Sequence, residues 1–221
     1  MKKIIGLSIA ALLILALVTG GTWAYFSDTE TSSANTFTAG TMDLKVSNDA
    51  ATYADGVTST WGGTNAKPGD SWSGTVTLKN AGSVTATYVE IKYGNTVTEV
   101  ATSAEILGTD PEVTDISSIM TVTALSYGGT DLLAKTSNVF NNLDIKAADT
   151  AGNSDGFITL NELNNVKLGT LTTLAGLAQN ATSAFAMTVS IPTATGNGIQ
   201  GDSVTTVVTF GLFQDASQHL P

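Results

Sequence analysis

The chain has 221 residues, of which 42% are hydrophobic and only 13% are charged. Its nine basic residues are all lysines and face 19 acidic residues, so the net charge is −10. This balance argues against binding to nucleic acid or anionic lipid, because both attract clustered Lys and Arg. Cysteine is absent, which excludes disulfides and thiolate metal sites, and the length suits one domain.

The chain begins with the pattern of an export signal. Lys2 and Lys3 precede an almost unbroken apolar run over residues 4–18, and Thr22-Trp23-Ala24 places small residues where a signal peptidase cuts. We therefore predict a signal peptide over residues 1–24, with cleavage between Ala24 and Tyr25. The alternative is an uncleaved anchor, but the run is shorter than the roughly 20 residues that a membrane span needs. Contact with the membrane is expected only before cleavage.

A polar, acidic arm, residues 25–36, follows the predicted cut. Its first seven residues are Tyr25, Phe26, Ser27, Asp28, Thr29, Glu30 and Thr31. One interpretation is a flexible tail or a short edge strand of the chain's own domain. The other is a strand that completes the sheet of a neighbouring molecule. The residues alone leave both open.

From residue 37 onward, alternation of apolar and polar residues predicts several short strands separated by turns. The segments are 37–46, 71–79, 84–93, 120–124, 185–191 and 208–212. The apolar phase changes near Tyr88 and Val89, which predicts a β-bulge. Lys67-Pro68-Gly69-Asp70 has the residues of a tight turn, and Asp110-Pro111-Glu112 predicts a short helix that ends near Ser117. Together these elements predict an all-β sandwich over residues 37–221.

A candidate calcium loop lies between residues 149 and 162. Its candidate ligands are Asp149, Asn153, Asp155, Phe157 through its carbonyl, Thr159 and Glu162. The spacing follows the second half of a calcium loop, but the first ligand position falls on Ala151, which cannot bind a cation. The alternative is a surface turn that leads into a short helix at Leu160. No cofactor is required, and calcium is the one candidate.

Signatures of an enzyme are almost absent. The single histidine, His219, lies close to the end of the sequence, where a tail residue is expected rather than a ligand, and one histidine cannot build the usual zinc site. Asn180-Ala181-Thr182 is an N-glycosylation sequence. Trp61 and Trp72 suit a carbohydrate platform. The alternative is that Trp72 fills the core and Trp61 lies in a loop or a subunit contact.

Two long motifs resemble the TasA/camelysin family. The first is Gly20-Gly21-Thr22-Trp23-Ala24-Tyr25-Phe26-Ser27-Asp28, followed by Asn35 to Leu44. The second runs from Lys67-Pro68-Gly69-Asp70 through a strand to Lys79-Asn80-Ala81-Gly82-Ser83. The C-terminal end, residues 205–213, is also similar, whereas residues 95–180 match only loosely.

The resemblance implies a secreted, fibre-forming protein whose signal is cut by a SipW-like signal peptidase. It also implies a jelly-roll arrangement of the sandwich and assembly with other copies of itself by exchange of the arm, residues 25–36. Camelysin relatives are described as metallopeptidases, but these residues supply no zinc site, and we do not expect an enzyme. The expected function is an extracellular filament subunit. The alternative is a monomeric secreted module that binds calcium or carbohydrate.

Overall fold

The computed structural model describes residues 40–57, 66–100, 113–196 and 198–221. The predicted signal peptide, its cleavage site and the arm, residues 25–36, lie outside the described residues, as do Trp61 and the Asp110-Pro111-Glu112 motif. The described residues fall in one unit, Gly40–Pro221.

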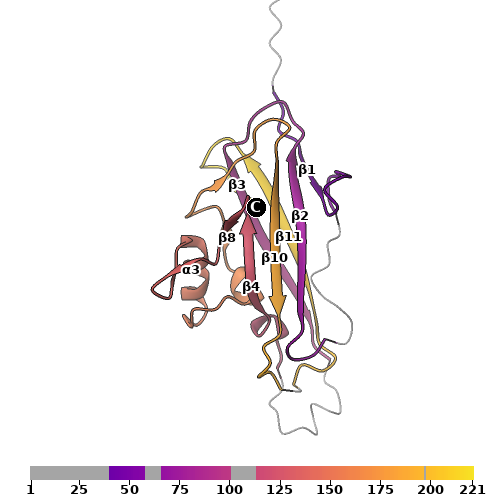
Figure 1. The fold of residues 1–221 in the computed structure, drawn as a ribbon, viewed down its shortest axis with the longest axis vertical. Helices are drawn as coiled ribbons and strands as arrows, with labels where there is room; N and C mark the ends of the chain where they lie inside the picture. Colours follow the sequence, from indigo (N-terminus) through magenta and orange to yellow (C-terminus); the bar gives the residue numbers. More distant parts are fainter. Residues whose placement is uncertain (1–39, 58–65, 101–112, 197) are drawn as a thin grey trace, which may run out of the picture. The chain divides into compact units, whose positions relative to one another are not determined.

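The first sheet is antiparallel and has the strand order β1-β2-β10-β4-β5 (Figure 1). Its strands are β1 (Leu44–Ser47), β2 (Ser71–Asn80), β10 (Thr182–Ser190), β4 (Thr121–Tyr127) and β5 (Thr130–Asp131). Alternating side chains of β2 and β10 face inward, so that Val76 lies opposite Phe185 in the core. The outward side chains of the same strands are mostly Ser, Thr and Ala. The strands predicted over 71–79 and 185–191 are thus confirmed.

The second sheet is also antiparallel and has the order β11-β3-β8, with β9 paired to β3 beside β8. Its strands are β11 (Ser203–Phe213), β3 (Tyr88–Thr98), β8 (Lys167–Leu168) and β9 (Leu174–Ala175). The register of β11 on β3 is continuous, so the bulge predicted near Val89 is wrong. The apolar phase changes there because β3 begins at Tyr88. The register shift lies instead between Thr188 and Val189, where β10 pairs with β4.

The first strand is shorter than predicted, since β1 begins only at Leu44. Residues 41–43 instead bind the turn after β2: the Ala81 N–H donates to Asp43 O at 2.7 Å, and the Ser83 N–H donates to Thr41 O at 2.8 Å. Gly82 makes this approach feasible, because a Cβ on it would lie 2.2 Å from Thr41 O. The turn therefore takes the hydrogen bonds that a longer strand would have made.

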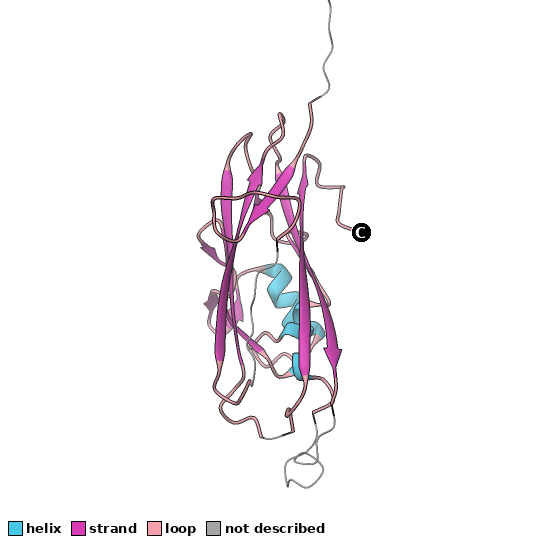
Figure 2. Cartoon of the chain, turned by 90° about the vertical axis from the view of Figure 1, so that its right-hand side faces the viewer, coloured by secondary structure: helices cyan, strands magenta, loops and turns pink. Residues whose placement is uncertain are grey.

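The two sheets pack face to face, as Figure 2 shows from the β1 side of the molecule. Phe185 of β10 lies at the centre of the core, with its ring 6.5 Å from that of Tyr93 and 5.3 Å from that of Phe210. Tyr93 and Phe210 belong to the second sheet, so these contacts join the layers. The all-β sandwich of antiparallel sheets is confirmed, whereas the jelly-roll connection stays a prediction.

A lobe of short elements closes the side of the sandwich that lies away from β1 (Figure 1). Its elements are β6 (Lys135–Thr136), β7 (Val139–Phe140), α3 (Leu143–Ala151) and α4 (Leu160–Leu163). The Val122 N–H of β4 donates to Ile158 O at 2.6 Å, which ties the lobe to the first sheet. A 3₁₀ turn, η1 (Ile116–Ser118), has Asp115 at its N-cap. Residues 113–115 are not helical, so the helix predicted to run from Asp110 to about Ser117 is wrong over the described residues before this turn.

One buried carboxylate ties α3 to the segment after β8. Asp144, in the first turn of α3, is 1% exposed and accepts four hydrogen bonds from the segment after β8. Its Oδ1 atom accepts from the Thr170 hydroxyl and the Leu171 N–H, both at 2.8 Å. Its Oδ2 atom accepts from the Gly169 and Thr172 N–H groups at 3.1 and 3.0 Å. A single side chain thus satisfies three buried or partly buried main-chain donors.

We expect Asp144→Asn to lower the free energy of unfolding by about 2–3 kcal/mol. The amide nitrogen of Asn is a donor, so it would replace one carboxylate oxygen and leave the groups that donate to that oxygen without an acceptor. Asp131→Asn is the matched control, since the exposed Asp131 accepts only from the Leu133 N–H among the described contacts. The control should change stability by less than about 0.5 kcal/mol. Urea unfolding followed by circular dichroism measures both. Equal losses in the two variants would contradict the anchoring role of Asp144.

Candidate functional site

The side of the sandwich opposite the lobe is open. Strand β11 has β3 as its neighbour on one edge and no strand on the other among the described residues. Strand β1, at the edge of the first sheet, covers only Thr77–Asn80 of the 10-residue β2. The edge of β11 and the edge of β2 before Thr77 therefore have no strand neighbour on this side among the described residues. An uncovered sheet edge is a surface to which a further strand can add.

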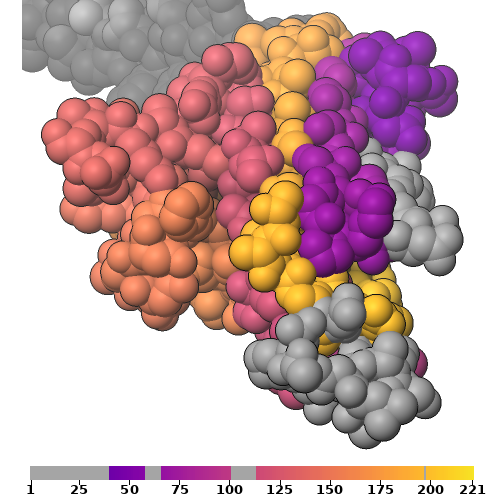
Figure 3. Space-filling view, turned by 60° about the horizontal axis from the view of Figure 1, so that its bottom comes forward, coloured from indigo at the N-terminus to yellow at the C-terminus, as the bar shows by residue number. Residues whose placement is uncertain are grey.

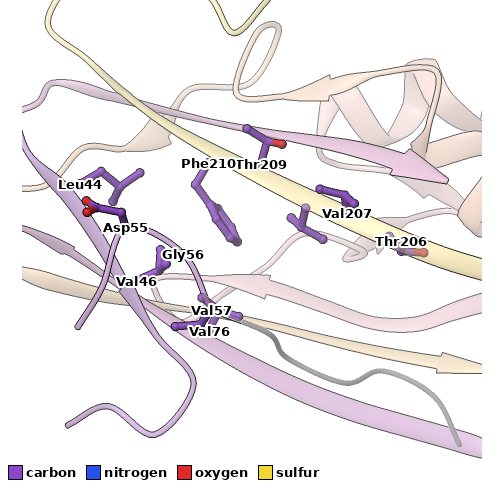
Figure 4. A pocket seen from close by; sticks show the side chains of 11 residues that line it. Leu44, Val46, Asp55, Gly56, Val57, Val76, Thr206, Val207, Thr209 and Phe210 are labelled. Carbon is purple, nitrogen blue, oxygen red and sulfur yellow. The ribbon is translucent and has the colours of Figure 1, made fainter. Parts of the chain in front are cut away.

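A groove of about 580 Å³ lies along this open side (Figure 4). Its lining residues are Leu44 and Val46 of β1, Val76 of β2, Asp55, Gly56 and Val57, and Thr206, Val207, Val208, Thr209 and Phe210 of β11. Most of them are apolar, and Asp55 is the one charged residue in the set. The groove is thus suited to an extended, uncharged or weakly charged segment rather than to a small ionic ligand.

The groove has a rigid floor and an accessible rim. Val46 and Val76 are buried, and Phe210 packs edge-on against Phe185, which fixes the β11 wall to the core. Val207, on the same strand, is 61% exposed. An apolar residue this exposed on a strand with one free edge is a liability for a protein that stays monomeric.

Residues 54–57 run along the free edge of β1 at one end of the groove. Ala54 and Val46 exchange two main-chain hydrogen bonds, of 2.8 and 3.0 Å. Next to this bridge, Lys45 Nζ lies 2.5 Å from Asp55 Oδ1 and 3.3 Å from Asp43 Oδ1. The Lys45 ammonium donates hydrogen bonds to the carboxylates of Asp55 and Asp43, and these bonds raise its pKa. Val57 packs partly against the core.

The turn before β2 is the predicted one and docks on the segment after β10. The Asp70 N–H donates to Lys67 O at 3.0 Å, and Gly69 adopts a positive φ of 90°. The Gly69 N–H donates to Ile191 O at 2.8 Å, and the Ile191 N–H donates to Asp70 O at 2.9 Å. Figure 3 shows the purple residues of this turn against the yellow residues that follow β10. An ion pair of 2.7 Å with Lys67 lowers the pKa of Asp70.

The candidate calcium residues lie close together in the lobe, but their side chains bind the chain itself. Asp149 Oδ1 accepts from the Gly156 N–H at 2.9 Å, and Asp155 Oδ1 accepts from the Phe157 N–H at 2.8 Å. Asn153 hydrogen-bonds to Asp155 through its side-chain amide at 2.9 Å. Lys135 Nζ donates to Gly156 O and lies 4.3 and 5.4 Å from the ring centroids of Phe140 and Phe157.

The last two candidates, Thr159 and Glu162, form a capping box. Thr159 is the N-cap of α4, and Glu162 Oε2 accepts from the Thr159 N–H at 2.8 Å. The helix predicted at Leu160 is thus confirmed. In the part of the chain that the structure describes, no three His, Cys, Asp or Glu side chains converge as a metal site. Glu162 Oε2 is engaged in this cap, and calcium binding stays a prediction.

The calcium prediction requires that about 1 mM Ca²⁺ raise the melting temperature of the secreted form, because a ligand that binds only the folded chain stabilises it. Asp155→Asn should abolish the rise, whereas the control Asp131→Asn should keep it. Differential scanning fluorimetry with and without a chelator measures the effect. Identical melting temperatures in calcium and chelator would reject the site.

The glycosylation sequence lies in an exposed turn, and Trp72 lies against the core. Asn180 is exposed in the turn before β10, with a positive φ of 60°, and its N–H donates to Asn80 O at 2.8 Å. Modification of Asn180 stays a prediction. Trp72 is partly buried against the core, where one of the two interpretations placed it.

His219 lies in a docked segment rather than in a free tail. Its Nδ1 atom contacts the carboxylate of Glu90, which is buried on the outer face of the second sheet, and the Leu220 N–H donates to the same carboxylate at 2.8 Å. Gly211 leaves room for Leu220, since a Cβ there would lie 2.9 Å from a Leu220 methyl carbon. In the sequence, this contact could have been found from Glu90, an acidic residue between two core positions.

The sequence model of the camelysin metallo-endopeptidase family matches residues 1–116, more than half of the chain. The chain belongs to this family. A catalytic zinc ion, which the family's name implies, does not fit the donor set: the chain has one histidine, which contacts Glu90, and no cysteine. Among the described residues, no helix is long and apolar enough to span a membrane.

The chain is also similar to the major biofilm matrix component of Bacillus subtilis (strain 168). The two are 40% identical over 85 residues, which are 38% of this chain and 29% of the relative. The match therefore spans less than a third of the relative's length.

Proposed function

We propose that this chain is a secreted structural subunit that polymerises into extracellular filaments. In this scheme the arm, residues 25–36, leaves its own subunit after cleavage at Ala24 and lies as a strand in the groove of the next copy. The free edge of β11 is the observation that carries the proposal, because its main chain can bind an added strand without rearranging the core.

The dimensions and chemistry of the groove support this occupant. The arm has 12 residues and, when extended, spans up to about 40 Å. It is therefore long enough to run along all five residues of β11 that line the groove. Tyr25 and Phe26 are large apolar residues for a groove lined by valines and Phe210. The remainder of the arm is polar and suits a strand with one face in solvent.

The comparisons support the same class of protein. The similar Bacillus subtilis protein is named a matrix component, which favours a structural role outside the cell. The family's name favours a peptidase instead, but the donor set of this chain does not fit zinc. The export pattern of residues 1–24 and a SipW-like signal peptidase belong to the proposal and explain how the arm becomes free.

The first test compares the chain that starts at Tyr25 with one that starts at Phe37, which lacks the arm. We expect filaments by electron microscopy only from the longer form, because both contain the groove but only one carries the strand that fills it. Both should have the same circular dichroism spectrum, since the described sandwich begins after residue 39. Filaments from both forms would contradict the role of the arm.

The second test separates the arm from the groove. Val208→Glu places a charge in the groove, and Val204→Glu is the matched control, a partly buried valine on the same strand outside the groove. Only Val208→Glu should stop filament growth, provided that both melt at similar temperatures. Mixed with the chain that starts at Phe37, Val208→Glu should form a dimer in size-exclusion chromatography, because one partner has only the arm and the other only a usable groove.

The mixing experiment also tests the alternative function, a monomeric binding module. A monomeric binding module would give neither the dimer nor filaments, and would leave the groove variants unchanged in assembly. Filaments from Val208→Glu at the wild-type rate would reject the groove as the acceptor, even if the arm proved necessary.

A further inference from the structure

The edge of β1 that faces away from β2 is already paired with residues of the same chain. Residues 54–57 place Ala54 against Val46, where the two residues exchange both of their main-chain hydrogen bonds. The same residues contribute Asp55, Gly56 and Val57 to the lining of the groove. At the β1 wall of the groove, residues 54–57 therefore occupy the position of an added strand. At the β11 wall, no described residues do so.

Among the described residues, few contacts hold residues 54–57. They are one bridge to Val46, the Lys45–Asp55 ion pair and the partial packing of Val57 against the core. The side chain of Asp55 is 86% exposed, so the ion pair is a weak one by the standard of surface pairs. An incoming strand that can make a longer ladder of hydrogen bonds would displace contacts of this kind.

We propose that residues 54–57 are a guard segment of the groove, held on β1 by the Lys45–Asp55 pair and displaced when the arm of another copy enters. This inference rests on the proposed function. The guard satisfies the main-chain groups of Val46 in the free subunit, which protects this edge from non-specific pairing. The arm therefore pairs first with the unguarded β11 and reaches β1 only after the guard has moved.

The test compares Asp55→Asn with Asp43→Asn in the chain that starts at Tyr25. Both variants remove one negative charge and one partner of Lys45, but only Asp55 belongs to the guard segment. We expect Asp55→Asn to extend preformed wild-type filaments about two- to fivefold faster than wild type, the factor that a surface ion pair can supply. Asp43→Asn should extend them at the wild-type rate.

Hydrogen exchange provides a readout that does not need filaments. In monomeric protein, the Ala54 and Val46 amides should exchange faster in Asp55→Asn than in wild type or Asp43→Asn, because opening the guard exposes both. Equal exchange in all three proteins, or faster exchange without faster growth, would overturn the guard and leave the proposed function intact. Absence of filaments from wild type would instead overturn the proposed function itself.

Discussion

The open side of this sandwich depends on one constraint, the difference in length between its two edge strands. Strand β11 has 11 residues and β1 has four, so β1 cannot cover the apolar face that β11 and β2 present to each other. The groove does not collapse because Phe210 is packed against Phe185 and the long β11–β3 ladder holds the wall straight. A hollow lined by apolar residues is thus a consequence of rigid, well-paired strands that lack a neighbour.

The opposite side of the sandwich is closed by other elements. There, short strands and the helices α3 and α4 close the sandwich, and Asp144 ties α3 to the segment after β8 through four hydrogen bonds. This difference between the sides gives the subunit a direction. Under the proposed function, the arm of one copy and the groove of the next would form a contact between unlike surfaces, which builds an open chain of subunits rather than a closed dimer.

Sequence patterns predicted β2 and β10 closely because these strands alternate strictly, and they predicted the turn at Gly69 and the helix at Leu160 from local chemistry. They predicted 84–93 and 208–212 where β3 (Tyr88–Thr98) and β11 (Ser203–Phe213) lie. The two-residue strands of the lobe are too short to show a period. The groove could not be predicted, since Val46, Val76 and Val208 meet only through strand pairing across the chain. The guard segment was hidden for the same reason, because the bridge between Ala54 and Val46 depends on how the chain turns back.

The two walls of the groove also differ in their relation to the family. Strands β1 and β2 lie within the residues that the family model matches, whereas β11 lies beyond them. An added strand would hydrogen-bond to β11 and insert its side chains between both walls. Under the proposed function, a change in β11 alone would therefore alter which arm the groove accepts while the arm and the β1–β2 wall stayed the same. Self-recognition would then reside in the wall that the family match does not include.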